Sequence, residues 1–211
     1  MNRSSVDLSG GWSFAYSLEP LPDMRTIAEL ETSGLPSYGC TVPGNFELDL
    51  QAAGLIEEPF YGMNMAALSP YEKAHIWYWR TFSAAQPSDT LAELCFEGLD
   101  CYADVYLNGE LIAACDNMLV EYHLPVDGLL AGSNELLVHI RPAVVEALQY
   151  DYAAGLQALR PGYEALYVRK APHMYGWDIM PRAVSAGIWR PVQLCFLPRE
   201  RLDQVYLETL D

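Results

Sequence analysis

The sequence is short of positive charge: 12 lysines and arginines stand against 28 aspartates and glutamates, which leaves a net charge of −16. Such a charge repels a phosphate backbone, so nucleic acid is not an expected partner. Long apolar runs are missing too, because no stretch of 18 apolar residues occurs, and no membrane partner is expected. The first residues lack the apolar core of a secretory signal, which favours a cytoplasmic protein, although a chain trimmed of its signal would look the same.

Patterns typical of metal centres, phosphate loops and nucleophilic triads are also missing. The cysteines are not spaced as Cys-x-x-Cys or beside histidines, so we expect reduced, buried thiols and neither a metal nor a cofactor. His123 and His139 fall in strand-like patterns and are expected to be structural, which leaves His173 as the histidine of interest. No pair of carboxylates is marked out by its surroundings, so we assign no catalytic residue to this chain. The five cysteines are Cys40, Cys95, Cys101, Cys115 and Cys195.

What the chain does have is a succession of short segments with the period-2 alternation of β-strands. Asn108-Gly109 stands between two of them and predicts a two-residue hairpin, because both central residues of a type I′ turn need a positive φ. Many short strands with turn signals at near-regular spacing indicate a sandwich or barrel and not a parallel sheet. The predicted strands are 12–18, 38–43, 76–82, 91–96, 102–107, 111–114, 119–124, 135–140 and 192–197. Residues 76–82 are β-branched or aromatic on both faces, which predicts a central strand covered on each side.

Helical signals are fewer. We expect a short helix at 25–31 and another that begins after Asn45, a capping residue, and ends at Gly54. Residues 58–71 mix prolines, aromatics and glycine and predict a long ordered loop. Residues 143–159 have a near-helical apolar period and predict the one helix of length. Residues 202–210 resemble a strand without a partner, as if another domain began there.

Residues 169–191 contain two of the five tryptophans, three of the fourteen prolines and two glycines, which predicts a structured loop that leads into a strand. Trp177-Asp178 within it is a pairing suited to sugars, because an indole face covers apolar C–H groups while a carboxylate accepts hydroxyl hydrogens. The alternative is that Trp177 belongs to the core and Asp178 to a turn.

Several blocks, taken in order, resemble the N-terminal sugar-binding domain of family 2 glycoside hydrolases, closest to the β-mannosidase branch. They cover nearly the whole chain. The blocks are Val42-Pro43-Gly44 with Asp49-Leu50, Glu58-Pro59-Phe60-Tyr61-Gly62, Trp79-Arg80-Thr81-Phe82, Phe96-Glu97-Gly98-Leu99-Asp100, the run 102–109, Asp116-Asn117-Met118, and Gly187-Ile188-Trp189-Arg190-Pro191.

The resemblance implies an all-β jelly-roll sandwich of the galactose-binding type over residues 1–199, with a short helical insertion and long ordered loops. Residues 200–211 would then begin a linker or the first strand of an immunoglobulin-like domain. It further implies a retaining glycosidase whose two catalytic glutamates lie in a TIM-barrel domain of the same polypeptide. A loop of the first domain would reach over the barrel mouth, with Asp178 and Trp177 binding the non-reducing end of a β-linked carbohydrate. Because this loop would dock on the barrel, its residues Tyr175, Trp177, Ile179 and Met180 are expected to be partly uncovered in this chain.

The mannosidase-like pattern continues with Trp-Gly-Pro, whereas Ile179-Met180-Pro181 follow here, so a β-galactoside or β-glucuronide remains open as the substrate. Two other readings also remain open. One is a free-standing carbohydrate-binding module, and the other is a purely structural interaction domain.

Overall fold

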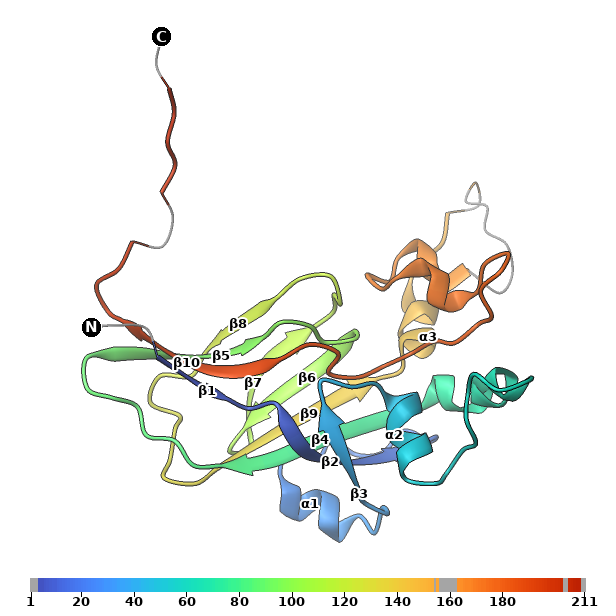
Figure 1. Cartoon of the computed structure of the whole chain (residues 1–211), viewed down its shortest axis with the longest axis horizontal. Helices are drawn as coiled ribbons and strands as arrows, with labels where there is room; N and C mark the ends of the chain where they lie inside the picture. The colour runs from blue at the N-terminus through green and yellow to red at the C-terminus, as the bar shows by residue number, and fades with distance from the viewer. Residues whose placement is uncertain (1–3, 154, 156–162, 203–204, 210–211) are drawn as a thin grey trace.

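The structure is a computed structural model and describes residues 4–153, 155, 163–202 and 205–209. Two sheets, antiparallel throughout, form a sandwich (Figure 1). This arrangement confirms the predicted all-β fold. The smaller sheet has the order β1 (Ser4–Asp7), β10 (Val192–Pro198), β5 (Thr90–Phe96), β8 (Tyr122–Pro125). The larger has the order β3 (Tyr38–Val42), β2 (Gly10–Ser17), β4 (His75–Phe82), β9 (Asn134–Arg141), β6 (Tyr102–Leu107), β7 (Glu110–Cys115).

The main core lies between the sheets and follows the alternation of the strands. On β4, Ile76 and Tyr78 enter this core, while Trp77 packs on the opposite face with residues that include Leu30 of α1 (Ile27–Thr32). The expectation that residues 76–82 form a central strand covered on both faces is therefore confirmed. The hairpin between β6 and β7 is confirmed as well, because Asn108 and Gly109 have φ values of 53° and 81°.

The two short helices begin where their capping residues predict. Thr26 and Glu29 form a capping box at the start of α1, and the Asn45 side chain accepts a hydrogen bond from the Leu48 amide at the start of α2 (Phe46–Ala52). The loop expected at 58–71 contains a 3₁₀ helix, η1 (Asn64–Lys73). Among the described residues, none of the helices combines the length and the apolar character needed to traverse a bilayer.

The prediction of one long helix at 143–159 is wrong for the residues of this range that the structure describes, 143–153 and 155. The α-helical portion is α3 (Ala143–Glu146), followed by one 3₁₀ turn, η2 (Ala147–Gln149), and an extended Tyr150. Tyr152, one of the residues that suggested a helical period, donates a hydrogen bond to the Ala147 carbonyl, and the hydroxyl of the neighbouring Tyr150 lies 2.9 Å from the Tyr102 hydroxyl. Aromatic packing therefore overrides the local helical pattern. Leu156 and Leu159 lie outside the described residues.

Two strand boundaries also differ from expectation. The strand expected to begin at residue 119 begins at Tyr122, because the side chain of Asn117 accepts from the Leu119 amide and the Tyr122 hydroxyl bonds the turn that precedes it. At the end of the chain, residues 202 and 205–209 form no strand. Whether residues 200–211 begin another domain stays a prediction.

Candidate functional site

The Trp177-Asp178 pair lies at the tip of a tight hairpin. The backbones of Trp177 and Met180 exchange two hydrogen bonds of 3.0 and 3.1 Å, so that Asp178 and Ile179 form the two-residue turn. Trp177 is 72% exposed and Ile179 is 89% exposed. Trp177 is therefore not a core residue. Asp178 is exposed and makes no hydrogen bond or ion pair with any described residue, so its carboxylate is available to a ligand.

The base of this hairpin is fixed by a buried aromatic ring and an arginine. Tyr175, at the end of η4 (Pro172–Tyr175), is buried, although we expected it to be uncovered with the tip. Gly176 follows at φ 102°, a conformation that favours glycine and turns the chain outward. The Arg182 guanidinium lies 5.6 Å from the centre of the Tyr175 ring, so both legs of the hairpin are held together.

Arg182 also ties the hairpin to two other segments. Its guanidinium donates hydrogen bonds to Glu72 of η1, at 2.7–3.1 Å, and to Glu164 of η3 (Tyr163–Leu166), at 2.9 Å. Burial lowers the pKa of Arg182, but the bonds to these carboxylates outweigh burial and raise it. A planar fork bound to two carboxylates has a defined orientation, which makes the base of the hairpin rigid.

A buried ion pair holds the chain on either side of the hairpin. Lys170, whose side chain is fully buried, donates to both carboxylate oxygens of Asp100 at 2.5 Å and to the backbone carbonyl of Ser185. Burial raises the pKa of Asp100 and the Lys170 ammonium opposes this rise. The Ser185 hydroxyl donates to Glu47 of α2 at 2.8 Å, so the return leg is bonded to the sandwich from two sides.

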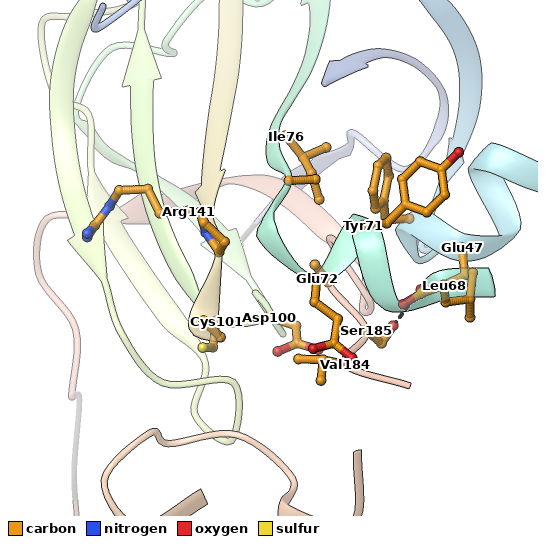
Figure 2. A pocket seen from close by; sticks show the side chains of 15 residues that line it. Glu47, Leu68, Tyr71, Glu72, Ile76, Asp100, Cys101, Arg141, Val184 and Ser185 are labelled. Atoms are coloured by element: carbon orange, nitrogen blue, oxygen red, sulfur yellow. Dashed lines mark hydrogen bonds between the residues drawn. The ribbon is translucent and has the colours of Figure 1, made fainter. Parts of the chain in front are cut away.

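Beneath the loop lies a small enclosed cavity. Figure 2 shows the carboxylates of Glu47, Glu72 and Asp100 near the segment that carries Ser185. Burial raises the pKa of Glu47, and the hydrogen bond from Ser185 opposes the rise. The cavity holds about 20 Å³, which is enough for one water molecule, whereas pockets for small ligands have roughly 300–1,000 Å³. A sugar does not fit there.

A second exposed apolar segment lies near the hairpin and was not singled out from the sequence as part of a site. Phe60, Tyr61 and Met63, which precede η1, are 76–82% exposed. An open groove of about 120 Å³ separates this segment from the return leg of the hairpin, and Phe60 and Ala183 contribute to its two walls. Both exposed tips lie at the end of the sandwich where β4 begins (Figure 1).

The motif glycines around the loop have packing roles. Gly187 exchanges two backbone hydrogen bonds with Asp100, and a Cβ there would lie 2.8 Å from the Gly44 carbonyl oxygen. A Cβ on Gly98 would lie 2.5 Å from the indole nitrogen of Trp189. Motifs distant in sequence therefore converge on the support of the hairpin. His173, by contrast, is exposed on η4, and its backbone carbonyl accepts a hydrogen bond from the Gly176 amide.

Residues 25–190 match the family described as glycosyl hydrolase 2 galactose-binding domain-like. The chain belongs to this family. The galactose-binding-like domain is 35% identical over 220 residues to beta-mannosidase B of Thermothelomyces thermophilus, with 99% of this chain and 23% of that protein covered. It is 32% identical to beta-mannosidase B of Emericella nidulans, with 89% and 22% covered. The domain thus spans less than a quarter of the length of these relatives.

Solved structures agree on the fold. The crystal structure of a beta-D-mannosidase from Dictyoglomus thermophilum matches with a TM-score of 0.74 and 31% identity, over 90% of this chain and 22% of that one. The exo-chitosanase CsxA of Amycolatopsis orientalis matches with a TM-score of 0.63 over 90% and 20%. At 19% identity, this second likeness concerns the fold alone. The expected family is confirmed, while sugar contacts by Asp178 and Trp177 stay a prediction.

Proposed function

We propose that this galactose-binding-like domain is the non-catalytic sugar-site domain of a retaining β-glycosidase of the β-mannosidase type. In this proposal the domain docks on a catalytic TIM barrel of the same polypeptide and closes the sugar site with the 177–180 hairpin. The observation that carries the proposal is the hairpin itself, in which an exposed indole and an unpartnered carboxylate project from a base fixed by one buried and one partly buried ion pair. Rigid support is what a binding residue needs to hold a ligand in one orientation.

The chemistry of the tip suits a sugar at an interface between domains. The Asp178 carboxylate can accept hydrogen bonds from two hydroxyl groups, and the Trp177 indole offers an apolar face for ring C–H groups. Ile179, together with Phe60 of the neighbouring segment, provides the apolar surface that a second domain would cover. A β-mannoside is the proposed substrate because the relatives named above are β-mannosidases, and a β-galactoside or β-glucuronide is the alternative.

The test compares Asp178→Asn with the unchanged protein, in the polypeptide that contains the barrel, on nitrophenyl β-mannoside, β-galactoside and β-glucuronide. A hydrogen bond to a charged acceptor contributes roughly 1.5–3 kcal/mol, so kcat/KM for the best substrate should fall about 10- to 150-fold. The 211-residue chain alone should hydrolyse none of the three. Its melting temperature should be unchanged by Asp178→Asn, because the carboxylate has no partner among the described residues.

Asp89→Asn is a matched control. Asp89 is also an exposed aspartate in a turn. It comes after the last residue of β4, whereas η1 comes before the first residue of β4, so Asp89 lies at the end of that strand opposite to η1. Its substitution should leave kcat/KM unchanged. An unaltered kcat/KM in Asp178→Asn would refute the assignment. Turnover by the 211-residue chain alone would refute the non-catalytic role, and tight sugar binding by that chain would favour a free-standing carbohydrate-binding module.

A further inference from the structure

The outer face of the smaller sheet gathers a set of metal-binding side chains. In the register of β5 with β8, Cys95 lies opposite His123, and in the register of β5 with β10, Glu93 lies opposite Cys195. Glu93 and Cys95 are two residues apart on one strand, so their side chains project from the same face. Three adjacent strands therefore bring two thiols, an imidazole and a carboxylate together.

The distances between these groups are short. The Cys95 Sγ is 3.3 Å from the His123 Nδ1, and this nitrogen is 3.6 Å from the Glu93 Oε2. One donor atom from each of these three residues lies within 4.8 Å of the others. The Cys195 Sγ is a further 3.4 Å from the Cys95 Sγ.

These separations match those between the ligands of a tetrahedral zinc ion. Zinc binds sulfur at about 2.3 Å and nitrogen or oxygen at about 2.0–2.2 Å, which places neighbouring sulfur and nitrogen ligands about 3.6 Å apart and neighbouring nitrogen and oxygen ligands about 3.4 Å apart. Two sulfur ligands would be about 3.8 Å apart. The Cys95–His123, His123–Glu93 and Cys95–Cys195 separations are therefore within a few tenths of an ångström of the tetrahedral values, and the donor atoms of Glu93 and Cys95 lie within 4.8 Å of each other.

The surroundings of the cluster also suit a cation. Cys95 is 7% exposed, whereas the His123 side chain is 51% exposed, so the cluster has a sheltered side and an entry side. Glu121 places a further carboxylate oxygen 3.7 Å from the His123 Nε2, where it can orient the ring as carboxylates do around zinc-bound histidines. Arg201 opposes binding, since its guanidinium lies 3.6 Å from the Glu93 Oε1.

We propose that Glu93, Cys95 and His123 bind a divalent zinc-type ion, with the Cys195 thiol within reach of the fourth position. Binding displaces the Cys95 thiol proton to solvent, because the thiolate is the ligand, and affinity therefore rises with pH. The ion would join β8, β5 and β10 across their outer face. The site has no sequence signature because its donors come from strands separated by up to 100 residues, and it is independent of the 177–180 hairpin.

The test titrates the reduced, metal-free chain with Co²⁺, whose thiolate complexes absorb in the near ultraviolet, and then displaces it with Zn²⁺. We expect a cobalt–thiolate band, a higher melting temperature with Zn²⁺, and a loss of affinity of roughly tenfold or more in Cys95→Ser and His123→Ala. His123→Ala keeps the test decisive if Cys95→Ser fails to fold, because half of the His123 side chain is exposed. Cys40→Ser, on the other sheet, and His173→Ala are the matched controls and should bind normally.

Three results would overturn the proposal. The first is a reduced chain that gives no cobalt–thiolate band. The second is an unchanged affinity in both ligand variants or an equal loss in the controls. The third concerns the chain purified without reductant or metal, in which a thiol reagent in denaturant would detect only three of the five cysteines. In that case Cys95 and Cys195 would form a disulfide instead of a metal site.

Discussion

Replacement of Lys170 by methionine should destabilise the domain more than any surface charge change. The Lys170 ammonium is fully buried and has three acceptors, the two oxygens of Asp100 and the Ser185 carbonyl. Methionine has a similar length but no donor, so the variant leaves a carboxylate that is 3% exposed without its counter-charge. Removal of one partner from a buried ion pair costs about 3–5 kcal/mol.

For a domain of this length, 1 kcal/mol corresponds to a shift in melting temperature of about 2–4 °C. Lys170→Met should therefore lower the melting temperature by about 6–20 °C, measured by calorimetry at neutral pH. The double variant Lys170→Met with Asp100→Asn should recover a large part of the loss, because Asp100→Asn removes the carboxylate charge that Lys170→Met leaves unpaired.

Arg25→Met is the control, since the ion pair of Arg25 with Asp23 is exposed to solvent. Its melting temperature should stay within the error of the measurement, because exposed ion pairs contribute little. If Lys170→Met behaved like this control, or if the double variant were no more stable than the single one, the buried pair would not be what holds the loop to the sandwich.

Two further predictions concern pH and packing. Burial raises the pKa of Asp49 from 3.8 to about 6, so between these pH values the folded state binds more protons than the unfolded state and stability falls as pH rises. Asp49→Asn keeps an acceptor for the Tyr78 hydroxyl and should raise the melting temperature more at pH 7.5 than at pH 4. An equal gain at both pH values would contradict this prediction. Gly98→Ala places a methyl group 2.5 Å from the Trp189 indole nitrogen and should lower the free energy of unfolding, measured in urea, by about 1–3 kcal/mol. The control is Gly132→Ala, where the new methyl group would have no atom within 4 Å, and it should not destabilise the domain. Similar losses in the two variants would refute the steric argument.

The strands could be predicted from the sequence because their evidence is local. The run of β-branched and aromatic residues in β4, and the Asn108-Gly109 turn, are formed by residues within a few positions of one another. The helix expected at 143–159 failed for the opposite reason, since the partner of Tyr150 is Tyr102, about 50 residues away. The strand β1 was missed because Ser4–Asp7 has no apolar face, and its pairing with β10 depends on backbone groups alone.

In the candidate site, too, local features could be predicted from the sequence and long-range contacts could not. Trp177 and Asp178 could be singled out as an unusual pair in a loop, but exposure is a property of the fold, and the alternative of a buried Trp177 could only be excluded by the structure. The support of the hairpin could not be foreseen, because Arg182 bonds Glu72 across 110 positions of sequence. Tyr175 was misplaced for a related reason: residues two positions apart in a loop have no fixed relation between their burial.

The pairing of β1 with β10 also has a mechanical consequence. Ser4 lies opposite Phe196 and Asp7 opposite Gln193, so the two ends of the chain leave the sheet on the same side of this strand pair. The hydrogen bonds between antiparallel strands run perpendicular to the strands. A force applied to residues 4 and 198 would therefore load these bonds one after another, as in a zipper, and not all at once in shear. Under tension, β1 would detach at low force while the remaining strands of the sandwich stay paired.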